Sequence, residues 1–143
     1  MAKAFSQKLH DENKFVEQVT CDLLVNHTGF VLRTPLNQQT EQYKKCDYEG
    51  YYNLKKVRVE AERKLVWTIK GKWMPQWDTI DVPYRKCESE ADLFIMANKD
   101  CNTFAIIPMK DILESPVIVK NTTYTKSEKF FAVPIKKWII VSP

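Results

Sequence analysis

Residues 57–64 read Val-Arg-Val-Glu-Ala-Glu-Arg-Lys, a stretch in which apolar and charged side chains alternate. Successive side chains of a strand point to opposite faces, so this alternation predicts a half-buried strand. One face carries Val57, Val59 and Ala61, which suit a core. The other face carries Glu60, Glu62 and Lys64, and residues two apart on such a face are separated by roughly 7 Å along the strand. The charged face is therefore where chemistry is expected.

The segments on both sides of this strand predict one helix followed by many strands. Apolar residues recur at three- and four-residue spacing through residues 15–24, which predicts a helix over 11–27. Asp11 suits its N-cap and Gly29 a left-handed C-cap. Further strands are expected at 30–32, 43–52 (with Gly50 as a bend or bulge), 79–82, 93–97, 103–107, 130–133 and 138–141, with a short helix at 109–113.

This order of elements predicts an α/β protein of the α+β type, because helices do not alternate regularly with the strands. The apolar run 93–97 is typical of a strand buried on both faces, and with 103–107 it forms an expected hairpin. We therefore expect a mixed central sheet flanked by the N-terminal helix. Residues 1–143 are interpreted as one domain, with 1–10 as a loose leader.

Composition excludes several classes of protein. Of the 143 residues, 44% are hydrophobic and 28% charged, which is typical of a globular domain. The net charge of +4 permits a nucleic-acid partner without requiring one. The four cysteines form no CxxC pair, so the closely spaced thiolates of a zinc site are missing. We find no signal peptide and no run near the roughly 20 apolar residues of a membrane span, and expect a cytoplasmic protein with reduced thiols.

The charged face of the strand suits metal-dependent cleavage of phosphodiesters. Such cleavage needs carboxylates that hold Mg²⁺, and a lysine beside them can activate water or offset charge at the phosphate. Glu62 and Lys64 offer one acid and the lysine. A second acid must come from a neighbouring element, and Asp47 lies in the preceding segment at a distance that suits two adjacent strands joined by a turn.

A helix carrying an acid, then a strand, then Asp47, then Glu62-x-Lys64 resembles the PD-(D/E)XK nuclease superfamily, which is restriction-endonuclease-like and Holliday-junction-resolvase-like. The resemblance covers about residues 11–97, although Cys46 stands where the family has a proline. It implies that Asp47 and Glu62 hold Mg²⁺ or Mn²⁺ and that Lys64 is catalytic. It also implies an accessory role for Glu17 on the helix. Further alternatives stay open here: Glu60 is a third ligand or a decoy, and Glu12, which falls on the apolar stripe, is a second helical candidate.

Aromatic and basic residues are interleaved in the segment 67–86. Arg85 and Lys86 follow a strand end and suit phosphate binding. Lys70, Lys72 and Trp73 belong to a loop rich in tryptophan, where cations beside rings suit stacking on unpaired bases. The alternative is that at least two of the tryptophans are core anchors.

These features predict a metal-dependent endonuclease, a hydrolase that acts on DNA rather than RNA. Neither histidine has a Ser or Cys partner for triad chemistry, and three glycines leave no phosphate-cradling loop. The alternative is a non-catalytic protein with a nuclease-like fold that binds nucleic acid or another protein, which the aromatic content of 12% also suits. A homodimer in which strands at 130–141 pair with a second copy stays possible.

Overall fold

The computed structural model describes residues 7–39, 46–122 and 126–143 of the chain. Its helices are α1 (Gln7–Thr28) and α2 (Met109–Leu113), with 3₁₀ turns η1 (Leu36–Gln38), η3 (Tyr84–Glu88) and η4 (Ile135–Lys137). Its strands are β1 (Tyr48–Tyr52), β2 (Lys55–Arg63), β3 (Thr79–Pro83), β4 (Leu93–Ala97), β5 (Phe104–Pro108), β6 (Val117–Lys120), β7 (Glu128–Pro134) and β8 (Ile139–Val141). None of the described helices is long and apolar enough to span a membrane.

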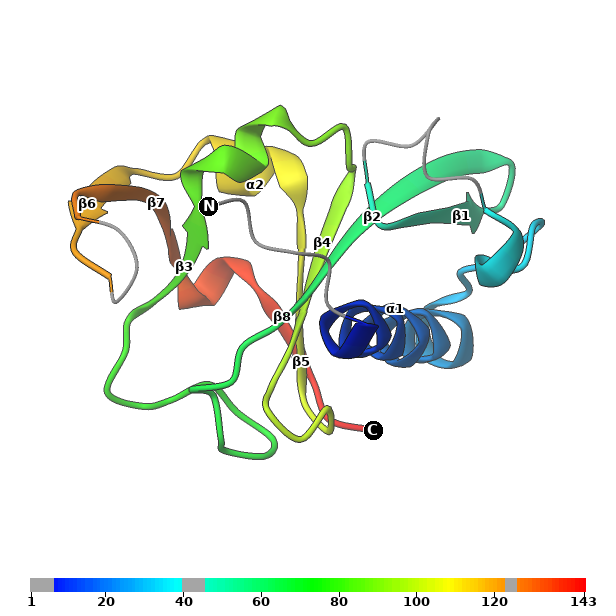
Figure 1. The fold of residues 1–143 in the computed structure, drawn as a ribbon, viewed down its shortest axis with the longest axis horizontal. Coiled ribbons are helices and arrows are strands. Elements are labelled where there is room, and N and C mark those ends of the chain that lie inside the picture. Colours follow the sequence, from blue (N-terminus) through cyan, green and yellow to red (C-terminus); the bar gives the residue numbers. More distant parts are fainter. Residues whose placement is uncertain (1–6, 40–45, 123–125) are drawn as a thin grey trace.

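Two sheets and the long helix form the fold, which confirms the expected α+β class. A five-stranded sheet has the order β1-β2-β4-β5-β8, and a three-stranded antiparallel sheet has the order β3-β7-β6. The larger sheet is mixed, because β2 pairs with β4 in parallel whereas its other neighbours are antiparallel. The expected hairpin is β4–β5. In Figure 1, α1 lies beside β1, β2 and β4, and the three-stranded sheet lies at the opposite side of the molecule.

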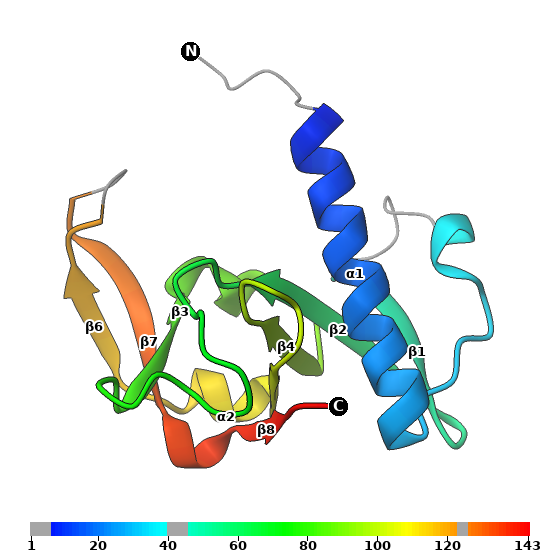
Figure 2. The ribbon, with the colours of Figure 1, turned by 90° about the horizontal axis from the view of Figure 1, so that it is seen from below.

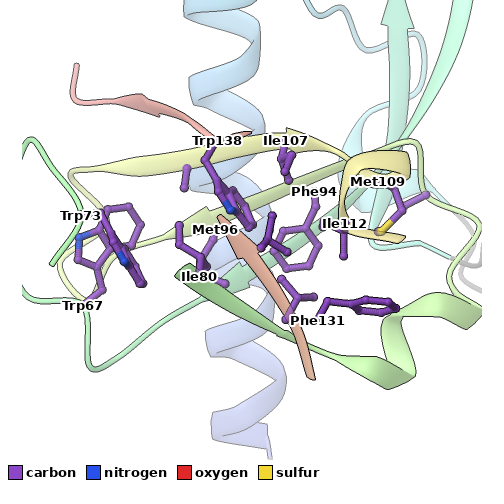
Figure 3. Packing of buried hydrophobic residues seen from close by; sticks show 14 residues of the cluster. Trp67, Trp73, Ile80, Phe94, Met96, Ile107, Met109, Ile112, Phe131 and Trp138 are labelled. Carbon is purple, nitrogen blue, oxygen red and sulfur yellow. The ribbon is translucent and has the colours of Figure 1, made fainter. Parts of the chain in front are cut away.

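The central strands bury both faces because each face meets a different layer. On β4, Ile95 and Ala97 face a cluster that includes Leu24 of α1. Phe94 and Met96 face the other cluster, built from β3, β7, α2 and three tryptophans (Figure 3). Side chains of a strand point alternately to its two faces, so a strand that is covered on both faces needs an apolar residue at every position. This explains the continuous apolar run at 93–97. The prediction of a doubly buried strand is confirmed.

Helix α1 is held against β1 by hydroxyl pairs as well as by apolar packing. The Thr20 hydroxyl shares a 2.9 Å hydrogen bond with the buried Tyr48 hydroxyl, and Thr28 shares one of 2.6 Å with Tyr52. Gly29 has φ +79°, so the left-handed C-cap is confirmed. The N-cap at Asp11 is wrong because the helix already includes Gln7. Figure 2 shows the N-terminal half of α1 extending beyond the sheets.

Two other expectations about strands are corrected. Segment 30–32 forms only an isolated bridge, between Val31 and Tyr51. Gly50 is neither a bend nor a bulge but pairs regularly with Val57, and the Phe30 ring occupies the space that a Cβ would need, 2.3 Å from its Cζ. Strand β6 was not predicted, since all four of its residues are exposed and no alternation marks it. The pairing of 130–141 with a second copy stays a prediction: β7 is the central strand of its sheet, and β8 is an edge strand.

Candidate functional site

The carboxylate cavity, as we name it, lies where the N-terminal half of α1, the start of β1, the end of β2 and η3 meet. Its volume is about 580 Å³. Carboxylates and cations line it in equal number: Glu12, Glu17, Asp47 and Glu62, with Lys14, Arg63, Arg85 and Lys86. Segments far apart in the sequence thus bring five of the predicted site residues to one place, together with the second helical candidate Glu12.

Asp47 is fixed beside the Glu62 strand by two hydrogen bonds. Its backbone N–H donates to the Val59 carbonyl at 2.9 Å, which extends the β1–β2 ladder by one residue. Its Oδ2 accepts a 2.7 Å hydrogen bond from the backbone N–H of Ala61, the residue before Glu62. Asp47 and Glu62 both line the carboxylate cavity, and their sharing of one metal ion stays a prediction.

Glu62 has an unusual environment for a carboxylate. Its Oε2 is buried and has no hydrogen-bond partner among the residues that the structure describes. A buried charged oxygen without a partner carries a large desolvation cost unless a cation or donor compensates it. This orphaned oxygen fits a bound cation better than it fits a purely structural role.

Lys64 directly follows β2 and lines a different cavity from Glu62. We name this second site, formed by the loop between β2 and β3, by β3 and by β6, the tryptophan cavity, because Trp73 and Trp77 form one wall of it. Burial lowers the pKa of Lys64 below its ordinary 10.5, and nearby Glu62 and Asp81 oppose that change. A lysine with a lowered pKa is neutral more often at working pH and is a better proton acceptor.

Glu60 is engaged in an ion pair rather than in the carboxylate cavity. Lys86 Nζ lies 2.8 Å from its Oε2, and the Ser89 hydroxyl donates to its Oε1 at 3.4 Å. Both charged side chains are largely buried, with 11% of Glu60 and 19% of Lys86 exposed. Because Glu60 does not line the carboxylate cavity, its role as a third metal ligand finds no support in this geometry.

The predicted nucleic-acid contacts divide into two groups. Arg85 and Lys86 line the carboxylate cavity, whereas Lys70 and Lys72 are exposed and line neither cavity. Trp73 is only 6% exposed and packs in the core, so the interpretation of tryptophans as core anchors holds for it. The exposed ring is Trp77, at 36%. Its place after Pro75 in a loop tip was the signal that could have singled it out.

Four carboxylates line the carboxylate cavity, but among the described residues no three of them are placed to share one metal ion. Within the described residues 7–39, 46–122 and 126–143, no group of three or more His, Cys, Asp or Glu side chains is placed to hold a metal ion. Mg²⁺ in proteins is commonly held by one or two carboxylates and keeps several waters. Asp47 and Glu62 therefore fit a magnesium site completed by water, and the orphaned Oε2 of Glu62 agrees with it.

Comparisons of the chain with protein-family models, with curated proteins and with solved structures gave no match.

Proposed function

We propose that the chain is a metal-dependent nuclease of the PD-(D/E)XK kind, with a restriction-endonuclease-like fold and its centre in the carboxylate cavity. The single observation that carries the proposal is the buried, unpartnered Oε2 of Glu62 beside the anchored carboxylate of Asp47. A buried carboxylate oxygen near a second carboxylate favours a divalent cation, which would offset the desolvation cost of the buried oxygen.

Each residue has a defined task in this proposal. Asp47 and Glu62 would hold Mg²⁺ or Mn²⁺, and the bound ion would polarise a phosphodiester and lower the pKa of a bound water. Lys64 directly follows β2, two residues after Glu62, and would accept the proton of the attacking water. Arg85, which is exposed on η3, would contact the phosphates that flank the cleaved bond.

The test combines metal binding with cleavage. Calorimetric titration with Mn²⁺ is expected to show one site in the wild type, and Glu62→Gln is expected to lose it. A panel of single-stranded, duplex and branched DNA, with the matching RNA forms, is then incubated with Mg²⁺ or with EDTA. Glu114→Gln is the matched control, because Glu114 is exposed at the end of α2 and lines neither cavity.

The proposal fails if the wild type cleaves none of the panel. It also fails if Glu62→Gln cleaves as fast as Glu114→Gln. A specific observation favours a second candidate, a nuclease-like protein that binds nucleic acid without cutting it: no three-acid group is found among the described residues. Nucleic-acid binding without a Mn²⁺ site would select that second candidate.

A further inference from the structure

The tryptophan cavity is a second concave site with a chemistry of its own. Its volume is about 530 Å³, within the range of about 300–1,000 Å³ that is usual for small-ligand pockets. One wall carries the rings of Trp73 and Trp77. The other wall is polar and includes Lys64, which follows β2, Asp81 from β3 and Lys120 from β6.

The aromatic wall is part of a series of three tryptophan rings that contact one another from the core to the surface. The Trp67 and Trp73 centroids lie 4.9 Å apart, and the Trp73 and Trp77 centroids 5.5 Å. Trp67 is fully buried, and its indole N–H donates to the Lys72 carbonyl at 2.9 Å. Figure 3 shows Trp67 and Trp73 side by side at one end of the core cluster. Trp77, the outermost ring, is the one that a ligand can reach.

Backbone hydrogen bonds hold this loop to the β4–β5 turn. The Lys99 N–H donates to the Trp67 carbonyl at 2.8 Å, and the Gly71 N–H donates to the Thr103 hydroxyl at 2.7 Å. Gly71 has φ +87°, a conformation that other residues rarely adopt. A wall that is already ordered loses little conformational entropy on binding, which favours affinity.

The polar wall offers donors and acceptors with a balanced charge. Lys120 Nζ lies 2.6 Å from one oxygen of Asp81, and the Thr79 hydroxyl donates to the other at 2.9 Å. Lys64 and Asp78 complete a lining with two cations and two carboxylates. The indole N–H of Trp73 is buried and has no partner among the described residues. The cavity therefore suits a flat, neutral ligand whose edges both donate and accept hydrogen bonds.

We propose that the tryptophan cavity binds an unpaired nucleobase, which stacks on Trp77 and meets the polar wall with its hydrogen-bonding edge. A nucleobase is flat and neutral and carries both donors and acceptors, and base–aromatic stacking is a common means of binding unpaired strands. Lys64 lines this cavity, and Glu62, two residues before it at the end of β2, lines the other. As a statement about substrate, the inference rests on the proposed function: the nuclease would act next to an unpaired base.

The test measures binding without cleavage, in EDTA. Anisotropy and tryptophan quenching are recorded with a labelled single-stranded DNA, its duplex, an abasic strand of equal length and free nucleoside monophosphates. The intact single strand is expected to bind more tightly than the abasic strand and the duplex. Trp77→Ala is expected to weaken binding of the intact strand by about 5- to 150-fold, the effect of losing one base–aromatic stack.

Two further variants keep the test decisive. Trp77→Phe retains a ring and is expected to keep most of the affinity, even if Trp77→Ala is poorly folded. Tyr51→Ala removes an aromatic side chain of β1. Because Tyr51 lines neither cavity, this variant is expected to bind like the wild type.

Several outcomes would overturn the proposal: equal binding of intact and abasic strands, or equal binding by Trp77→Ala and Tyr51→Ala. Free monophosphates that bind as tightly as the strand would assign the site to a free nucleotide and overturn its role in the nuclease. Cleavage that persists without base-dependent binding removes this inference alone. Base-dependent binding without cleavage removes the proposed function instead.

Discussion

The carboxylate cavity and the tryptophan cavity meet at the end of β2 but are built in different ways. The carboxylate cavity takes its charged side chains from α1, from the residue before β1, from β2 and from η3, so it exists only when these segments are packed together. The aromatic wall of the tryptophan cavity comes from one loop, fixed by its own rings and by the β4–β5 turn. We therefore expect changes in the carboxylate cavity to disturb contacts between several elements, and a change of the exposed Trp77 in the tryptophan cavity to affect mainly affinity.

The largest expected effect is on the reaction rate. Lys64→Met should lower the rate of metal-dependent cleavage by about 100-fold or more, the usual contribution of a positioned proton-transfer group. Mn²⁺ affinity should stay close to that of the wild type, because Asp47 and Glu62 remain. Single-turnover kinetics measure the first quantity and calorimetry the second.

Lys56→Met is the control for that change, because Lys56 lies in β2, is exposed and lines neither cavity. Equal cleavage rates in the two variants would place Lys64 in the tryptophan cavity only, with no part in the chemistry.

The next largest expected effect is on stability, and it differs between Lys86 and Arg85, two neighbouring cations of the carboxylate cavity. Lys86→Ala should lower the free energy of unfolding by about 1–3 kcal/mol, because it leaves the buried carboxylate of Glu60 without its cation. Arg85→Ala should change it far less, since Arg85 is exposed. Urea denaturation monitored by circular dichroism measures both. If the two variants unfold at the same urea concentration, the Glu60–Lys86 pair has no structural role.

Much of this arrangement could be predicted from the alternation at 57–64. That pattern placed Glu62 and Lys64 on one strand face and required a second acid from a neighbouring element, and Asp47 is adjacent in the structure. Strand β4 and its hairpin with β5 were equally clear because their apolar runs are continuous.

Other features depend on contacts that no local pattern encodes. The partner of Glu60 is Lys86, on the 3₁₀ turn after another sheet's strand, so the pair could not be inferred from either segment. The burial of Trp73 depends on its packing against Trp67, a contact that the sequence around Trp73 does not encode. Strand β6 has three β-branched residues that favour a strand, but its full exposure removes the alternation that would mark it.

A smaller effect is expected from the pH dependence of stability. Because the folded-state pKa of Lys64 is lowered, the unfolded chain keeps its proton up to about 10.5 while the folded protein has already released it. The titration of Lys64 therefore makes the free energy of unfolding rise with pH between the lowered pKa of the folded state and the ordinary value of 10.5. Lys64→Met should lose this rise and should be more stable than the wild type at neutral pH.

The difference in the free energy of unfolding between the wild type and Lys64→Met isolates the contribution of Lys64. This comparison is needed because another group titrates in the same pH range. Burial, with a smaller effect of Asp22, raises the pKa of Cys21 from 9.0 to about 11, which lowers stability as pH rises through that window. This effect is present in both proteins and cancels in their difference. Urea midpoints of the wild type and of Lys64→Met at several pH values measure this difference. A difference that does not change with pH would contradict the buried environment of Lys64.

The smallest effect distinguishes the two cavities by salt. Binding of DNA in EDTA should weaken linearly with the logarithm of salt concentration, and Arg85→Ala should reduce that slope by about one, the loss of one phosphate contact. Trp77→Ala should lower affinity with the slope unchanged, because stacking releases no counterions. Anisotropy titrations at several salt concentrations measure both. If the two variants change the slope alike, the division into a phosphate-binding and a base-binding cavity is wrong.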